Sequence, residues 1–256
     1  MRNAALVGYY TMVRKDIIRI FRIWSQTLLP PVITNVLYFT IFGTFIGSQL
    51  QEIGGHSYME FIVPGLVMMT IITSAYMNTV STFYFAKFIK NIEELLVSPM
   101  PSWVIVAGFV TGGVMRAFLV GTLVVATSLF FTHLNIFNIF IVFAAAFLTS
   151  ILFAFAGLVN GFFAKSFDAI SIVPTFVLTP LTYLGGVFYS VSLLPEPWQS
   201  LSLYNPILYM VNAFRYGFLG FSDVNIVTCF VVLGGLTVIF FGITLWLFIR
   251  GAGFKN

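Results

Sequence analysis

Long stretches without charge alternate with short charged or proline-rich segments along most of the chain. Residues 23–51 and 61–86, for example, contain no Asp, Glu, Lys or Arg. About 20 consecutive apolar residues suffice for a helix to cross roughly 30 Å of hydrocarbon. The pattern therefore predicts six membrane-spanning helices, at about residues 27–47, 61–86, 104–131, 138–164, 169–189 and 224–249.

Prolines refine two of these predicted spans. Pro30 and Pro31 fall in the opening turn of the first, where a missing amide hydrogen costs least. Pro174 and Pro180 lie inside the fifth, so we expect them to bend it.

Two segments do not fit the spanning pattern. In residues 1–26, most apolar and basic positions occupy opposite sides of a helical wheel, which is typical of an amphipathic helix lying in the membrane interface. A solvated helix packed on a soluble neighbour is the alternative. Residues 191–223 are broken by several prolines and by Arg215, which indicates two half-length helices forming an outer re-entrant hairpin. The sequence thus predicts an all-α, polytopic membrane protein with residues 1–256 in one transmembrane domain.

Composition agrees with this pattern. Hydrophobic residues make up 59% of the chain and charged residues only 8%, whereas a soluble domain carries about 25% charged residues. This excludes a soluble enzyme and a nucleic-acid-binding protein. The single cysteine, Cys229, excludes a disulfide within the chain.

The positions of the basic residues predict the topology. Six spans place both termini on one side of the membrane, and Arg215 is the only cation on the other side, with Arg116 inside a predicted span. By the positive-inside rule, the side of the termini is cytoplasmic. The cations on that side are Arg2, Arg14, Lys15, Arg19, Arg22, Lys87, Lys90, Lys165, Arg250 and Lys255.

Few residue patterns point to chemistry within the chain. No carboxylate falls in the middle of a predicted span, and both histidines fall in predicted outer loops without a partner at metal-ligand spacing. No Gly-Lys pair occurs, so a phosphate-binding loop of the common ATPase type is absent. We therefore expect no catalytic residue, no metal site and no cofactor in this chain. Energy for uphill transport would have to come from another subunit.

Arg116 is the one charge inside a predicted span, and two interpretations of it stay open. It can extend toward lipid phosphates at the cytoplasmic interface, or it can be buried and contact an anionic head group of a substrate. Three Gly-x-x-x-Gly pairs, beginning at Gly43, Gly108 and Gly157, are candidate sites of close helix approach.

Two local motifs carry a resemblance to a known family. Residues 93–99 read Glu-Glu-Leu-Leu-Val-Ser-Pro, and a second motif has Leu194-Pro195 followed by Asn205-Pro206, Tyr209 and Arg215. Together with the predicted layout, they resemble the membrane subunits of type-2 ABC transporters, which are mostly bacterial exporters. One departure is Asn212, where many relatives carry an acidic residue.

The resemblance implies a permease of the bacterial inner membrane that forms a homodimer and docks a cytoplasmic ABC ATPase, which binds ATP and Mg. It would export an amphipathic substrate such as a drug, lipid or glycoconjugate. Residues 87–103 would be the coupling segment, with residues 165–168 as a second contact. The implied coupling residues are Lys87, Lys90, Glu93, Glu94, Leu95, Leu96, Pro99, Lys165 and Asp168.

Two alternatives remain at this point. Glu93 and Glu94 can simply form the solvated face of a short helix. The whole chain can be a channel subunit or an assembly scaffold that does not pump.

Overall fold

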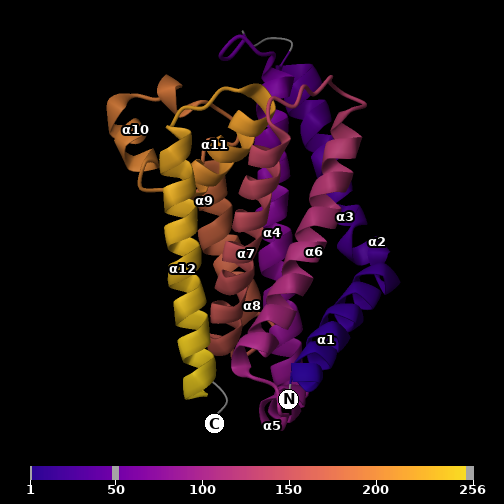
Figure 1. The fold of residues 1–256 in the computed structure, drawn as a ribbon. Coiled ribbons are helices and arrows are strands. Elements are labelled where there is room, and N and C mark those ends of the chain that lie inside the picture. Colours follow the sequence, from indigo (N-terminus) through magenta and orange to yellow (C-terminus); the bar gives the residue numbers. More distant parts are fainter. Residues whose placement is uncertain (1, 48–51, 252–256) are drawn as a thin grey trace.

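Long helices run side by side through the molecule and are joined at its two ends (Figure 1). The computed structural model describes residues 2–47 and 52–251, and within these residues it contains helices and no extended strand. The predicted all-α class is therefore confirmed. Four of these helices are long and apolar enough to cross a membrane: α4 (Tyr58–Phe88), α6 (Ser102–Ser128), α7 (Ile139–Phe163) and α12 (Ile226–Arg250).

Helix α4 is the centre of the bundle. In the most apolar 18-residue stretch of α4, 78% of residues are buried. The corresponding share is 11% for α12, which lies at the periphery. It begins with a capping box, in which the Ser57 hydroxyl accepts from the Glu60 amide and the Glu60 carboxylate accepts from the Ser57 amide. Helices α6 and α7 pack along it.

The first and fifth predicted spans are broken into shorter pieces. The first consists of α2 (Trp24–Thr27), α3 (Leu29–Tyr38) and a π-helical segment, η1 (Phe39–Ile46), with prolines in the opening turn of α3 as predicted. The fifth consists of α8 (Ala169–Val173), the π-helical η2 (Pro174–Leu178) and α9 (Thr179–Tyr183). Both η2 and α9 begin at or next to a proline, which lacks the amide hydrogen for a regular α-helical bond.

The fifth helical region ends at Tyr183, earlier than the predicted 189. Gly186 follows in a left-handed conformation with φ of 72°, which glycine adopts without strain and which turns the chain. Residues 184–190 therefore form a turn instead of continuing the helix.

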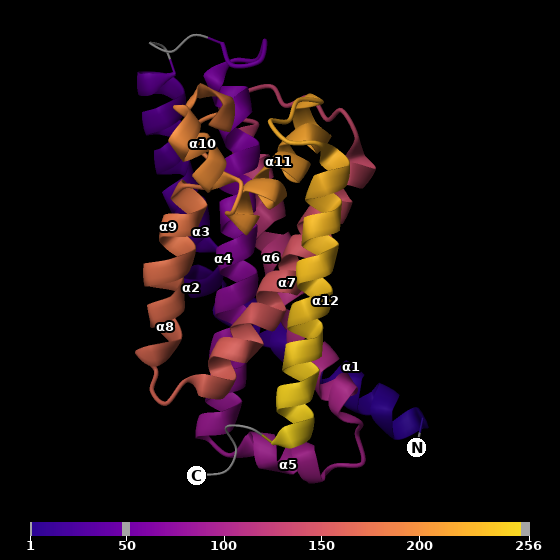
Figure 2. The same ribbon diagram turned by 90° about the vertical axis from the view of Figure 1, so that its left-hand side faces the viewer.

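The predicted half-length helices of residues 191–223 are present. After a 3₁₀ turn, η3 (Val191–Leu193), come α10 (Glu196–Ser202) and α11 (Pro206–Leu219). The Asn205 side chain caps α11 by accepting from the Ile207 amide at 3.0 Å, and it donates to the Leu181 carbonyl in α9 at 2.6 Å. The chain between α10 and α11 therefore contacts α9, and α11 then packs against α4, α7 and α12. Figure 2 shows α10 above α9 and apart from α12.

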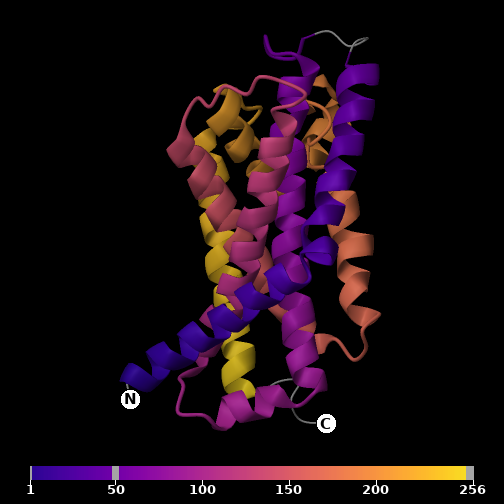
Figure 3. The same cartoon turned by 90° about the vertical axis from the view of Figure 1, so that its right-hand side faces the viewer.

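Helix α1 (Arg2–Arg22) crosses the lower part of the bundle obliquely (Figure 3). It packs on α6, where Gly108 and Gly112 leave room for Met12 and Asp16 of α1. The Tyr9 and Thr111 hydroxyls form a hydrogen bond of 2.9 Å along the same contact. The predicted pair of Gly108 and Gly112 thus lies at a helix contact.

Of the other two glycine pairs, one also lies at a helix contact. Gly157 and Gly161 of α7 face Tyr76 and Phe83 of α4. In the first pair Gly43 faces Met59, whereas Gly47 faces only its own helix. Both glycines of a pair therefore allow close approach where two long helices pack together. The Gly-x-x-x-Gly spacing alone does not produce such a contact.

Candidate functional site

A short helix, α5 (Asn91–Val97), lies across one end of the bundle (Figure 2). Ile92 is buried and anchors it, whereas Glu93 and Glu94 are exposed. The exposed fraction is 88% for Val97 and 38% for Leu96. The outward surface of α5 thus combines two carboxylates with apolar side chains. Leu95 is half-buried, and Pro99, which follows the helix, is exposed.

The two lysines next to α5 have different surroundings. Lys87 donates to the carbonyls of Phe162 at 2.8 Å and Ala164 at 3.3 Å, where α7 ends. A cation at a helix C-terminus satisfies carbonyls that the helix leaves free. Lys87 therefore connects α4 to α7, and the sequence pattern gave no sign of this role. Lys90 is exposed and connects α4 to α5.

The second predicted contact segment lies beside the first. Lys165 and Asp168 are exposed, and Phe167 between them packs on Tyr84 and Phe88 of α4. The ring centroids are 4.9 and 5.2 Å apart, respectively. The structure thus brings the residue 165–168 turn to the end of α4 that leads into α5. We call α5 and this turn together the end surface.

Lys90 is the only described non-glycine residue with a positive φ, at 61°. A side chain in this conformation costs about 1 kcal/mol relative to glycine. We expect Lys90→Gly to raise the thermal unfolding midpoint slightly in detergent, and Lys90→Val to lower it. Lys165→Gly, where φ is not positive, is the control and should not raise it. A fall in the midpoint with Lys90→Gly would show that the contacts of the lysine side chain stabilise the protein more than the positive φ destabilises it.

A buried polar cluster at the opposite end centres on Arg215 of α11. This side chain is fully buried, and its Nη2 donates to the Gly186 carbonyl at 2.6 Å. Its Nη1 lies 3.9 Å from an Asp223 carboxylate oxygen, and the guanidinium carbon lies 3.8 Å from the centre of the Phe61 ring. Nε and Nη1 have no hydrogen-bond acceptor among the described residues.

Asp223 connects this cluster to the turn after α9. Its carboxylate accepts from the Ser190 hydroxyl and, at 3.2 Å, from the Val191 amide. Asn212 accepts from the Asp223 amide at 2.9 Å and so fixes the loop that holds the carboxylate. The cluster therefore joins α4, the turn after α9, α11 and the segment leading to α12. We call it the Arg215 cluster.

Other residues of the C-terminal motif lie at the starts of α10 and α11 or stabilise the chain between them. Pro195 precedes the first turn of α10, and Pro206 opens α11. The Tyr209 hydroxyl donates to the Leu203 carbonyl at 2.7 Å. Asn212 does not pair with Arg215. The acidic partner of Arg215 is Asp223, which lies outside the helix, and Asn212 binds the Asp223 amide instead. The motif did not indicate Asp223, which lies outside it in the sequence.

A second polar cluster lies where α1 meets α4 and α6. Asp16 is buried and pairs with Arg19 at 3.0 Å, and it accepts from the Asn78 side chain at 3.2 Å. Arg19 donates to Asn78 at 2.9 Å and to the Thr82 hydroxyl. Burial raises the pKa of the Asp16 carboxyl above its usual range, and Arg19 partly opposes this shift. Helix α1 is thus tied to the bundle by polar contacts as well as by packing.

Arg116 lies at the edge of this second cluster. It is half-buried, and its Nη2 is 3.4 Å from the Thr27 carbonyl, where α2 ends. Arg116 interacts electrostatically with both Arg19 and Asp16. We call Asp16, Arg19, Asn78 and Arg116 the Asp16 cluster. The polar side of α1 is therefore not wholly solvated, because Asp16 and Arg19 turn toward the bundle.

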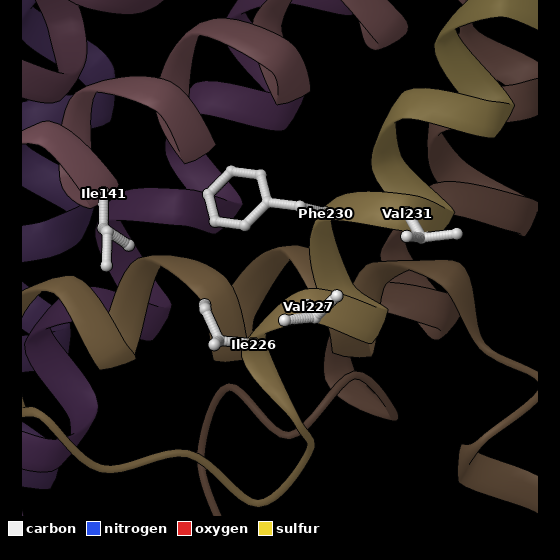
Figure 4. Close-up of a pocket in the computed structure, with 5 residues that line it drawn as sticks. All are labelled: Ile141, Ile226, Val227, Phe230 and Val231. Atoms are coloured by element: carbon white, nitrogen blue, oxygen red, sulfur yellow. The ribbon is translucent and has the colours of Figure 1, made fainter.

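Two surface grooves have apolar and aromatic linings. One, of about 450 Å³, lies between α7 and α12, and Figure 4 shows the Phe230 ring directed from α12 toward Ile141. The other, of about 490 Å³, lies between α1 and α6 and includes Tyr9 and Trp103. Neither carries a charged side chain that would select a substrate. Among the residues with described side chains, no group of His, Cys, Asp or Glu is arranged to hold a metal ion.

Long apolar helices with apolar outer faces are typical of an integral membrane protein. Residues 8–219 match the family described as ABC-2 type transporter, and the chain belongs to that family. Membership implies an ABC ATPase as a partner subunit and confirms the resemblance of the sequence motifs.

Two relatives illustrate the range of similarity. The chain is 58% identical to the inner membrane transport permease YadH of Escherichia coli (strain K12), over 100% of both chains. It is 26% identical to nodulation protein J of Rhizobium leguminosarum bv. viciae, over 79% of this chain and 80% of that protein.

Proposed function

We propose that this chain is the membrane subunit of an ATP-driven exporter in which two copies of the permease each dock one cytoplasmic ATPase. In this proposal ATP and Mg are bound by the partner, and the permease moves an amphipathic substrate outward. The principal support is the end surface. An interaction that transmits force needs exposed contact residues on a firmly anchored element, and α5 has both features.

The end surface also limits the partner's chemistry. Glu93 and Glu94 are exposed beside Leu96 and Val97, and the Phe167 side chain is 47% exposed nearby. A complementary surface would present basic groups around an apolar pocket. Lys90, Lys165 and Asp168 would lie at the rim, whereas Lys87 would act indirectly by holding α7.

We place the protein in the bacterial inner membrane with both termini in the cytoplasm. The 58% identical relative is named as an inner membrane permease. Two interrupted helices, 29–46 and 169–183, would complete six spans with the four long helices. Helices α10 and α11 would then form the re-entrant hairpin at the outer side, where the Arg215 cluster lies.

The substrate path would run along α4. Between residues 69 and 81 most positions of this helix are buried, and the half-buried ones recur every fourth residue. A stripe with this spacing lies on one face of a helix. Its members are Met69, Thr73, Met77 and Ser81, which alternate apolar and hydroxyl side chains. Such a face suits an amphipathic drug, lipid or glycoconjugate.

Reversing the charge of Glu93 and Glu94 tests the proposal. Like charges placed against each other at an interface cost several kcal/mol, so we expect Glu93→Lys with Glu94→Lys to weaken ATPase co-purification about tenfold or more. The measurement is the ATPase-to-permease ratio after affinity purification in mild detergent, together with ATP hydrolysis by the complex.

The matched control is Glu52→Lys with Glu196→Lys, which reverses two exposed carboxylates at the other end of the bundle. It should leave both readings unchanged. If the Glu93 and Glu94 variant co-purifies normally and hydrolyses ATP normally, the end surface is a solvated face, and a channel or scaffold function becomes the better explanation.

A further inference from the structure

The junction of α1 and α2 is strongly cationic. Arg22 is exposed at the end of α1, Arg14 and Lys15 are exposed about two turns earlier in the same helix, and Arg19 and Arg116 are partly buried. Asp16 is the single carboxylate among them, and Arg19 holds it at 3.0 Å. One carboxylate does not balance this number of cations, so the region carries a net positive charge.

Arg116 lacks a full set of partners. Its hydrogen bond from Nη2 to the Thr27 carbonyl is long, at 3.4 Å. Its Nε and that of Arg19 are buried without an acceptor among the described residues. A partly buried guanidinium costs several kcal/mol unless a negative group compensates it. The compensation from Asp16 is already shared with Arg19 and Asn78.

The depth of this region in the membrane follows from Thr27. This residue ends α2, and α3 begins at Leu29. Residues 29–46 at about 1.5 Å per residue cover roughly 27 Å, close to the hydrocarbon thickness. If residues 29–46 cross the hydrocarbon, as proposed above, Thr27 lies at its boundary with the head groups, and the Arg116 guanidinium beside Thr27 lies at the same level.

We propose that the phosphate group of a membrane phospholipid binds between the α1–α2 junction and α6, with Arg116 and Arg19 as its principal contacts. A guanidinium matches phosphate oxygens in geometry as well as in charge. The exposed Phe21 and Trp24 side chains flank the junction and suit lipid tails and their interface. Arg14, Lys15 and Arg22 contribute a surrounding field without contacting the phosphate.

The test compares variants that lose the same charge at different places. The purified chain in detergent is titrated with phosphatidylglycerol, and bound lipid is counted by native mass spectrometry. We expect Arg116→Gln to weaken lipid binding about tenfold, the usual effect of losing a charge-assisted contact. Arg22→Gln removes an exposed cation from the same region and should weaken it less than about twofold.

A third variant tests the opposite direction. Asp16→Asn removes the carboxylate that competes for the arginines, so lipid binding should become stronger. This variant keeps the test decisive if Arg116→Gln fails to fold, as judged by gel filtration, because an unchanged affinity in Asp16→Asn contradicts the proposal. Arg116→Lys keeps the charge but loses the paired donors of the guanidinium, so it should recover only part of the binding.

Two further arms identify the source of the phosphate. Dioleoylglycerol has the same kind of tails without a phosphate, and equal binding of this lipid would overturn the proposal. Inorganic phosphate alone should not raise the thermal unfolding midpoint at millimolar concentration. A rise that Arg116→Gln abolishes would assign the site to a soluble anion and reject the lipid. Equal losses of lipid affinity in Arg116→Gln and Arg22→Gln would show that binding depends on the overall positive charge of the region, and this result would overturn the proposed site.

Discussion

Replacing Arg215 by methionine is expected to destabilise the protein by about 3–5 kcal/mol, because it leaves a buried carboxylate without its cation. Asp223 is 4% exposed at its side chain and would keep only its Ser190 and Val191 contacts. The Gly186 carbonyl would lose its donor at the same time. The free energy of unfolding, from SDS titration in mixed micelles, measures the effect.

Two further variants test this explanation. Arg22→Met removes an exposed arginine and should change the free energy of unfolding by less than about 0.5 kcal/mol. Adding Asp223→Asn to Arg215→Met should recover part of the loss, since the unpaired charge is then absent. A single Arg215→Met variant as stable as the parent protein would show that the ion pair is dispensable.

Gly157→Val is expected to be similarly severe, at about 3 kcal/mol. A Cβ atom at Gly157 would stand 2.7 Å from the Tyr76 carbonyl oxygen and 3.2 Å from the Val80 amide nitrogen of α4. Both neighbours are backbone atoms, so neither can move aside by changing a rotamer. Helices α4 and α7 would have to separate along their contact, and the same SDS titration would detect this.

The matched control lies in α12. Gly235 is also in the middle of a long apolar helix, but nothing within the chain lies within 4 Å of a Cβ added there. Gly235→Val should leave the free energy of unfolding nearly unchanged. Equal destabilisation by the two substitutions would mean that valine disturbs the helix itself and not the contact between α4 and α7.

The two polar clusters connect helix α4 to other parts of the bundle. The Arg215 cluster joins α11 to α4 and to the turn after α9, and the Asp16 cluster joins α1 to the same helix, α4, lower down. Helix α4 continues into the turn that carries α5. Helix α4 therefore provides continuous contacts from the end surface to α1 and to α11.

Local patterns were sufficient to predict many of the elements. Charge-free stretches predicted the long helices, and the four long ones differ from the predicted boundaries by only a few residues. The prolines of residues 191–223 predicted two short helices, which are present as α10 and α11. The fifth helical region was predicted too long, because hydropathy does not register the turn at Gly186.

Partners of the charged residues were not predictable in the same way. Lys87 was predicted to be a coupling residue, which stays a prediction, and the sequence did not indicate that it donates to a carbonyl of α7 located 75 residues away. Residues 1–26 were predicted to form an amphipathic helix in the membrane interface, and that pattern did not indicate that Asp16 is buried against α4 and α6. Neither contact leaves a periodic signal, because each depends on two helices that are distant in the chain.

By itself, the sequence determined the class of protein, the approximate positions of its helices and the motifs that indicate its family. Hydrophobicity and helix-breaking residues act locally, so they can be read along the chain. The tertiary structure alone decided that Asp223 pairs with Arg215, that Gly157 meets the backbone of α4, and that Arg116 lies beside Thr27. These contacts exist only where packed helices bring side chains together, because burial makes an uncompensated charge or an overlapping atom costly.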